Sequence, residues 1–225
     1  MNDMGFIELK GITKSFNDGS GNRKVLDSLD LSLDKGDFVA VTGVSGAGKT
    51  TLLNILGTLL TPDEGSYFID GTDVLAPGTD LLRLRNRRIG FVFQDHRLLP
   101  QFTVMQNILL PALADSNSVQ PDVNEWAAQL VRIMGIENLT SQQPETLSGG
   151  EKSRAAICRA LIMKPDLLLA DEPTGQLDAG HAREVAELLC RVNRELGTTI
   201  VLVTHSDALA HSASRIYQLM EGKLS

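Results

Sequence analysis

Residues 43–51 read Gly-Val-Ser-Gly-Ala-Gly-Lys-Thr-Thr, and they combine the groups needed to hold a triphosphate. Three glycines within six positions allow backbone angles and close approaches that let successive N–H groups point at one anion. Lys49 adds a positive charge for the β- and γ-phosphates, and the Thr50 hydroxyl can bind Mg²⁺. The plainer interpretation is a glycine-rich turn that binds nothing, but the full Gly-x-x-x-x-Gly-Lys-Thr spacing favours nucleotide binding. The residues predicted to contact the phosphates are Gly43, Val44, Ser45, Gly46, Ala47, Gly48, Lys49, Thr50 and Thr51.

Two adjacent carboxylates form a second candidate site. Asp171 and Glu172 follow the apolar run 167–170, which is typical of a buried strand. Open α/β sheets bind ligands at the carboxyl ends of their strands. Asp171 is therefore predicted to hold Mg²⁺ together with Thr50, and Glu172 to orient or deprotonate an attacking water. Adjacent acids after a strand also occur by chance. The pair indicates a catalytic site only in combination with the glycine loop.

A third cluster lies at residues 147–151, which read Leu-Ser-Gly-Gly-Glu. Ser148, Gly149 and Gly150 can form a second anion-binding nest at the start of a helix that is expected to end near Met163, before Pro165. A Ser-Gly-Gly sequence is more often an ordinary turn and helix cap. The order of the three clusters along the chain favours the phosphate-binding interpretation here.

Short apolar runs that alternate with amphipathic stretches must position these groups. Such runs, flanked by helices, indicate an α/β fold with a parallel sheet covered on both faces. From about 95 to 163 the pattern becomes helical, most clearly over 125–134, and a helix around 180–195 is expected to end at Gly197. We therefore expect one domain over 1–225, with a nucleotide-binding core at 1–94 and 164–225 and a helical subdomain at 95–163. The predicted strands are 6–12, 25–33, 38–41, 67–69, 89–93, 167–170 and 200–203, and the first two are joined by a polar hairpin at 17–22.

Composition narrows the possible partners. A net charge of −7 argues against a nucleic-acid partner bound by broad electrostatic attraction. The one dense basic cluster, at residues 83–88, is interpreted as a solvated helix face. No apolar run approaches the roughly 20 residues that span a bilayer, and residues 1–5 lack the features of a signal peptide. We expect a protein of the reducing cytosol unless a partner holds it at a membrane.

The order of the three clusters resembles that of the ATP-binding-cassette (ABC) ATPases, whose signature is Leu-Ser-Gly-Gly-Glu/Gln. The resemblance covers essentially the whole chain. It implies a RecA-like P-loop core, an antiparallel β subdomain and an inserted α-helical subdomain. It also implies ATP and Mg²⁺ as ligands, and ATP hydrolysis as the activity.

The resemblance assigns roles to four further residues. Gln94 matches the Q-loop glutamine that senses Mg²⁺ and the γ-phosphate. His205 matches the switch histidine at the γ-phosphate, although a lone histidine after a strand is usually structural. Asp178 matches the D-loop aspartate that communicates between the two sites of a dimer. Phe16 stands where an aromatic ring stacks on adenine.

The resemblance further implies partners. Two copies would bind head to tail, with each ATP between one chain's glycine loop and the other chain's signature. Residues 90–94, 98–100 and 169–175 are similar to lipoprotein-releasing and macrolide-exporter ATPases. These act with membrane permeases, which implies a peripheral position on the cytoplasmic side of the cell (inner) membrane. The sequence departs from that group at Gln176 and at residues 151–154, and a soluble ABC ATPase of an assembly pathway, such as iron–sulfur cluster biogenesis, stays the alternative.

A final hypothesis concerns residues 95–102, which follow Gln94 directly. Leu98, Leu99 and Phe102 form an apolar cluster in a stretch expected to be a loop. They are either part of the subdomain core or the lining of a groove that receives a cytoplasmic helix of the permease.

Overall fold

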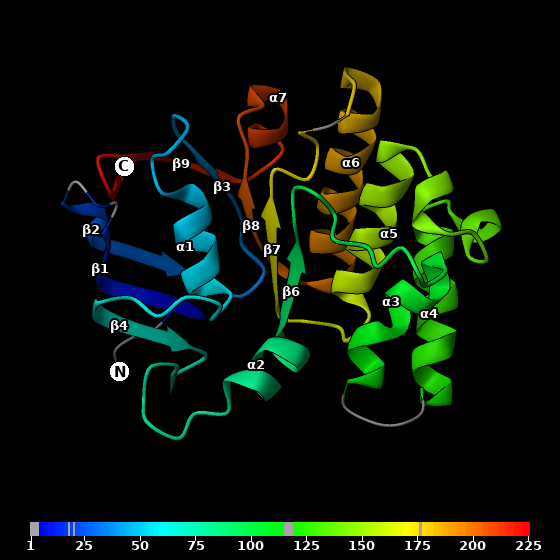
Figure 1. The fold of residues 1–225 in the computed structure, drawn as a ribbon, viewed down its shortest axis with the longest axis horizontal. Coiled ribbons are helices and arrows are strands. Elements are labelled where there is room, and N and C mark those ends of the chain that lie inside the picture. The colour runs from blue at the N-terminus through cyan, green and yellow to red at the C-terminus, as the bar shows by residue number, and fades with distance from the viewer. Residues whose placement is uncertain (1–4, 18, 20, 115–118, 176) are drawn as a thin grey trace.

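The computed structural model describes residues 5–17, 19, 21–114, 119–175 and 177–225. Residues 1–4, positions 18 and 20 of the predicted hairpin, residues 115–118 and Gln176 lie outside this description. Within it, two β-sheets and a group of helices lie side by side (Figure 1). None of the described helices has the length and apolar character needed to cross a bilayer.

The first sheet is antiparallel, in the order β2-β1-β4-β5. Ile7 pairs with both Leu33 and Ile69, so β1 is the inner strand that joins the predicted hairpin to β4. The antiparallel β subdomain predicted from the family resemblance is therefore confirmed. Its strands are β1 (Ile7–Asn17), β2 (Asn22–Leu33), β4 (Glu64–Ile69) and β5 (Thr72–Asp73).

The second sheet has the order β10-β9-β3-β8-β7-β6, and all of its pairings are parallel except that of β10 with β9. The sequence analysis did not predict β9 and β10, because β9 is mostly exposed and carries no apolar run. The strands of this sheet are β3 (Phe38–Thr42), β6 (Ile89–Val92), β7 (Leu167–Asp171), β8 (Thr199–Val203), β9 (Arg215–Met220) and β10 (Lys223–Leu224).

The apolar run of β7 shows why this sheet must be covered on both faces. Successive side chains of a strand point to opposite faces. Leu167 and Leu169 enter the core shared with α1 and the antiparallel sheet, whereas Leu168 and Ala170 enter the core shared with the helices. All four are fully buried. In Figure 1, α1 lies between the two sheets and α3, α4 and α5 gather on the far side of β6.

The helical region is stabilised by caps and by one buried polar contact. Thr103 and Gln106 form a capping box at the start of α3. The indole N–H of Trp126 in α4 donates to the carbonyl of Leu161 in α5, at 3.1 Å. The helices are α1 (Lys49–Leu56), α2 (Leu81–Arg88), α3 (Val104–Leu113), α4 (Pro121–Ile133), α5 (Gly149–Leu161), α6 (Ala179–Leu196) and α7 (Asp207–Ala210).

Candidate functional site

The glycine loop joins β3 to α1, as predicted, and two of its glycines are required by packing. A Cβ on Gly43, which has a φ of 148°, would lie 2.4 Å from the carbonyl oxygen of Leu219 in β9. A Cβ on Gly48, which has a φ of 105°, would lie 2.8 Å from a methyl carbon of Val25 in β2. Both sheets therefore press against this loop, and a larger residue at either position would displace it.

Lys49 begins α1 and is only 6% exposed. Its ammonium donates to the carbonyl oxygens of Gly43 at 2.8 Å and Val44 at 3.0 Å, and lies 3.3 Å from Nε2 of His205. Burial lowers the pKa of the Lys49 ammonium, while the charge of Glu172 and, less strongly, that of Asp171 raise it. The loop thus holds a partly buried cation whose partners within the loop are uncharged carbonyls.

The two carboxylates stand at the end of β7 and reach different partners. Burial raises the pKa of Asp171, while the nearby Thr50 hydroxyl and the charges of Lys49 and Arg97 lower it. Glu172 lies 2.9 Å from Nε2 of His205, measured from its Oε1 atom. Thr50 and Glu172 line one cleft, whereas the buried Asp171 is not among its lining residues.

Glu172 is held in an unusual backbone conformation. Its φ is 45°, a region that non-glycine residues rarely adopt. Its N–H donates to the carbonyl of Val203 in the neighbouring strand at 2.9 Å, and its own carbonyl accepts the N–H of Gly175 at 3.0 Å. An added Cβ on Gly175 would lie 3.5 Å from Oε2 of Glu172 and 3.6 Å from Nε2 of Gln94. The Gln94 amide and the Glu172 carboxylate thus meet around this glycine.

These groups surround a cleft of about 500 Å³. The structure brings together in it most of the predicted loop residues with Phe16, Gln94, Glu172 and His205. Phe16 is 42% exposed and lies at the rim, in the β subdomain. The cleft is lined by Phe16, Arg23, Val25, Ser45, Gly46, Gly48, Lys49, Thr50, Thr51, Gln94, Glu172 and His205.

The sequence analysis missed Arg23 and Val25. Arg23 pairs with Phe16 across the β1–β2 hairpin, and its Nη2 lies 3.5 Å from the carbonyl oxygen of Gly46. The hairpin itself was predicted, so its register would have placed this arginine beside the candidate adenine contact. Arg23 adds a cation to the same wall of the cleft.

The Leu-Ser-Gly-Gly-Glu cluster does not line this cleft. The Ser148 side chain caps α5 by accepting the N–H of Glu151 at 3.3 Å, and the Glu151 carboxylate accepts the Ser148 N–H at 2.7 Å. Ser148 is exposed, Gly149 is half-buried and Gly150 is buried. The capping interpretation is therefore correct within one chain, and any contact of Ser148 with nucleotide needs a second molecule.

Asp178 is likewise outside the cleft. It caps α6 by accepting the N–H groups of Gly180 and His181, at 2.9 and 3.1 Å. Its other carboxylate oxygen lies 2.6 Å from Nδ1 of His181. The ring of His181 lies beside Gly150, since a Cβ on that glycine would be 3.2 Å from the imidazole Cδ2. The start of α6 is therefore packed against the start of α5.

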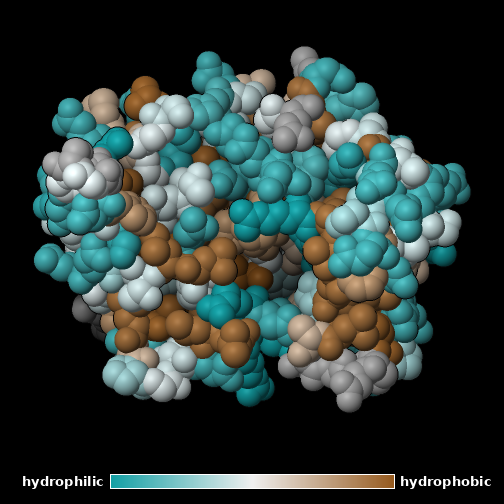
Figure 2. Space-filling view, in the orientation of Figure 1, coloured by the Kyte–Doolittle hydropathy of each residue, from teal (hydrophilic) through white to brown (hydrophobic). Residues whose placement is uncertain are grey.

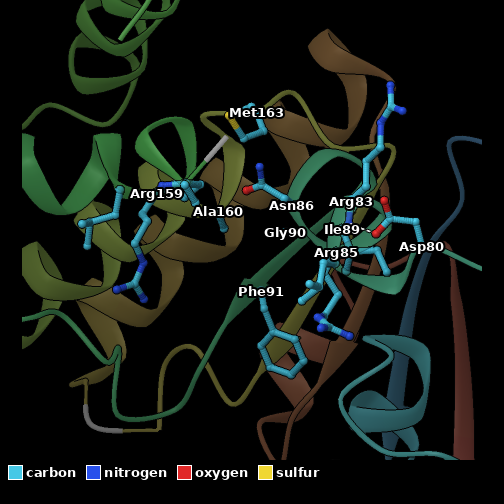
Figure 3. Close-up of a pocket in the computed structure, with 14 residues that line it drawn as sticks. Asp80, Arg83, Arg85, Asn86, Ile89, Gly90, Phe91, Arg159, Ala160 and Met163 are labelled. Carbon is cyan, nitrogen blue, oxygen red and sulfur yellow. Dashed lines mark hydrogen bonds between the residues drawn. The ribbon is translucent and has the colours of Figure 1, made fainter. Parts of the chain in front are cut away.

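A second hollow, of about 760 Å³, is lined by residues from α2, β6, α3 and the end of α5. Figure 2 shows this face hollowed between the two halves of the molecule, with apolar side chains on both walls. Figure 3 labels Phe91, Met163, Arg85 and Arg159 among the residues that line it. We call it the groove; it is lined by Asp80, Leu82, Arg83, Arg85, Asn86, Ile89, Gly90, Phe91, Leu110, Pro111, Ala114, Arg159, Ala160 and Met163.

Comparison with known proteins decides the family. The model of the ABC transporter family matches residues 26–175. This chain belongs to the ABC transporter family. The resemblance stated from the sequence motifs is thereby confirmed.

Curated relatives match almost the entire chain. The lipoprotein-releasing system ATP-binding proteins LolD of Porphyromonas gingivalis and Bacteroides thetaiotaomicron are each 44% identical over 219 residues, covering 97% of this chain and 98% of the relative. LolD 1 of Rhodopirellula baltica is 45% identical over 214 residues, covering 95% of this ABC protein and 93% of the relative.

Two solved structures of dimeric ATP-binding cassettes superpose on the chain with a TM-score of 0.89. One, a post-hydrolysis state bound to ADP and Pi, is 34% identical; the other, a bacterial ABC transporter cassette, is 35% identical. Each comparison covers 97% of this chain and 96% of the other. The predicted fold, an ABC ATPase domain, is confirmed.

Proposed function

We propose that this chain is the ATP-binding and ATP-hydrolysing subunit of an ABC transporter of the lipoprotein-releasing type. The observation that carries the proposal is the meeting of Lys49, Glu172 and His205 in one cleft, at the carboxyl end of the parallel strands. The full-length likeness to lipoprotein-releasing ATP-binding proteins supports the type of transporter. Because those relatives are lipoprotein-releasing ATP-binding proteins, we favour this role over that of a soluble ATPase of an assembly pathway.

In this proposal the glycine loop binds the triphosphate. Its N–H groups and the start of α1 form an anion-binding nest, and the Lys49 ammonium exchanges loop carbonyls for phosphate oxygens. Anionic acceptors bind an ammonium more strongly than neutral carbonyls do. Phe16 offers an aromatic face for adenine and Arg23 a second cation. Val44, at 74% exposed, and Ala47 contribute main-chain groups rather than side-chain chemistry.

Thr50, Asp171 and Gln94 are the residues we propose for Mg²⁺. The Thr50 hydroxyl is close enough to the Asp171 carboxylate to lower its pKa, so the two oxygens can bind one cation together. A hydroxyl, a carboxylate and an amide oxygen suit Mg²⁺, which usually keeps several waters and takes phosphate oxygens as its other ligands. When bound, Mg²⁺ neutralises charge on the β- and γ-phosphates.

Glu172 and His205 are proposed to act on the attacking water. The water oxygen bonds to the γ-phosphorus, the bond from that phosphorus to the β–γ bridging oxygen breaks, and ADP and phosphate result. Glu172 accepts the water proton. His205 lies 2.9 Å from Glu172 and 3.3 Å from Lys49, so it links the base to the cation at the γ-phosphate.

The position of Ser148, Gly149, Gly150 and Asp178 supports a head-to-tail dimer. These residues lie outside the cleft of their own chain, at the exposed starts of α5 and α6. In the dimer they would complete the partner's ATP site, as an isologous two-fold arrangement permits. The two similar solved cassettes are dimers, and one holds ADP and Pi.

A membrane permease is the second proposed partner, docked in the groove on the cytoplasmic side of the membrane. The groove has apolar walls and a basic edge, which suits a short amphipathic segment. Leu98, Leu99 and Phe102 do not line it. Leu98 packs against the helical core, and Asn107 bonds both main-chain groups of Leu99, at 2.7 and 3.0 Å. The core interpretation therefore fits Leu98. We propose that the permease docks in the groove rather than at residues 95–102.

The division into a core at 1–94 and 164–225 and a helical subdomain at 95–163 stays a prediction.

Two measurements on the full chain test the proposal. Purified protein with excess Mg²⁺ and ATP should release phosphate, and the chain should copurify with the permease of a lipoprotein-releasing system from detergent-solubilised membranes. Phosphate release without any membrane protein partner would support the soluble assembly ATPase instead. Absence of ATP binding would refute both.

A further inference from the structure

Arg159 of α5 holds the loop that follows Gln94. Its Nη2 atom donates to the carbonyl oxygen of His96 and its Nη1 atom to that of Arg97, both at 2.6 Å. His96 lies two residues after Gln94 and 63 residues before Arg159. Arg97 lies three residues after Gln94 and 62 residues before Arg159. The contact therefore ties the loop to a distant helix with the two-pronged geometry that a guanidinium provides.

The loop is in a conformation that needs such support. His96 and Arg97 have φ values of 60° and 46°, in the left-handed region that non-glycine residues rarely adopt. Residues in this region persist where their surroundings fix them. Within the loop, the His96 N–H donates to the carbonyl of Phe93 at 2.9 Å, and the Arg97 guanidinium stacks over the Phe93 ring at 4.1 Å. Arg159 adds a tether from outside the loop.

The His96 side chain does not replace this tether. It is 4% exposed, and neither ring nitrogen has a hydrogen-bond partner among the residues that the structure describes. Its ring therefore anchors the loop by packing alone. Arg159 is itself half-buried, and desolvation lowers the pKa of its guanidinium while the charge of Asp95 raises it. A half-buried guanidinium whose donors meet two carbonyls is costly to disturb.

We propose that Arg159 is a positioning residue for Gln94. By holding the carbonyls of His96 and Arg97, it fixes the position of the loop relative to the cleft. The Gln94 amide is thereby kept beside Glu172. The inference rests on the proposed role of Gln94 in turnover. Arg159 also lines the groove (Figure 3), so it touches both the proposed docking surface and the loop of the ATP site.

A double-mutant cycle on the full chain tests this proposal, with kcat and KM for ATP as the readouts. Arg159→Lys keeps the charge but loses the paired donors. We expect it to lower kcat by about 10-fold with KM changed by less than about two-fold, because a displaced positioning group affects the chemical step. In a Gln94→Ala background the same substitution should change kcat by less than about two-fold, since coupled residues are not additive.

Arg191→Lys is the matched control. Arg191 is also a helix arginine with a side-chain hydrogen bond, from its Nε atom to Oε1 of Glu195 at 2.8 Å, and it lines neither the cleft nor the groove. We expect its kcat to stay within about two-fold of the wild-type value. If Arg159→Lys fails to fold, Arg159→Gln serves instead, because a neutral amide is cheaper to bury and keeps an N–H donor.

Three results would overturn the inference. The first is an equal loss of kcat with and without Gln94, which would make Arg159 a structural residue that acts independently. The second is a wild-type kcat in a folded Arg159 variant. The third is a wild-type kcat in Gln94→Ala, which would refute the proposed role of Gln94 and the inference with it. The Gln94→Ala variant measured alone distinguishes this result from the first two.

Discussion

The glycine-loop cleft and the Leu-Ser-Gly-Gly-Glu cluster are both candidate phosphate sites, and they differ in where their polar side chains find partners. In the cleft, groups from different elements contact one another: Lys49 with His205, His205 with Glu172, and Thr50 with Asp171. At the cluster, Ser148 bonds only to the first turn of its own helix.

This difference indicates what each site needs. Long-range contacts preorganise the cleft, so that one chain can bind ATP with its own residues. At the starts of α5 and α6, some main-chain N–H groups already bond to the capping side chains. The remaining N–H groups can bond to a partner molecule that approaches these helix ends. We therefore propose that the cleft binds ATP in the monomer and that the cluster contributes to binding only in a dimer.

Glu172→Gln should have the largest effect on turnover and should separate the two sites. We expect kcat to fall by about 10²–10⁴-fold, the usual scale for loss of a general base. Binding of ATP and Mg²⁺ should remain, so an ATP-bound dimer should accumulate and be visible by light scattering. The exposed Glu187→Gln is the matched control. Turnover near the wild-type rate would move the base elsewhere, with His205 the next candidate.

Lys49→Ala tests whether the cleft binds ATP by itself. Removal of the ammonium should weaken ATP binding by about 100-fold or more, because hydrogen bonds between charged groups are among the strongest available to the site. The fold should persist, since the carbonyls of Gly43 and Val44 can bond to water instead. Isothermal titration measures the affinity and circular dichroism the fold. A folded variant with normal affinity would contradict the assignment.

Ser148→Arg tests the second site. Bulk and charge at the start of α5 should prevent the Glu172→Gln protein from forming its ATP-dependent dimer, because the residue would face the partner's γ-phosphate. ATP affinity of the monomer should change by less than about two-fold, as Ser148 is outside the cleft of its own chain. Size-exclusion chromatography with and without ATP shows the outcome. Dimerisation of the double variant would place the composite site elsewhere.

The smallest effect is expected from the pair of Asp178 and His181. The hydrogen bond and charge of Asp178 raise the pKa of His181, with Glu184 also raising it and Arg154 opposing. A raised histidine pKa stabilises the folded state below the unfolded value of about 6.5, and this contribution disappears as the pH rises through the folded value.

His181→Ala should therefore lower the melting temperature slightly at pH 5.5 and have a smaller effect at pH 8.5. Asp178→Asn removes the charge that raises the pKa of His181, so in that background the effect of His181→Ala should no longer depend on pH. An effect of His181→Ala that is equal at both pH values would mean that the histidine acts by packing against Gly150 rather than by charge.

Much of the candidate site could be predicted from the sequence because its parts are local. The glycine loop needs certain residues at fixed spacing between a strand and a helix, and the same holds for Asp171 and Glu172 at the end of a buried run. The strand β7 was evident because burial on both faces requires an unbroken apolar run. The strand β9 was not, since its exposed polar residues carry no such pattern.

The sequence by itself determined which groups could bind phosphate, while only the tertiary structure decided which of them meet. Residues 83–88 were interpreted as a solvated helix face, yet Arg88 bonds to Asp166 at 2.7 Å and to Asp70 at 2.9 Å. Arg159 reaches a loop more than sixty residues away, and Ser148 turns out to lie outside the cleft of its own chain. Spacing along a chain encodes the contacts of one turn or one strand; contacts between distant segments depend on how the sheets and helices pack, which no local pattern specifies.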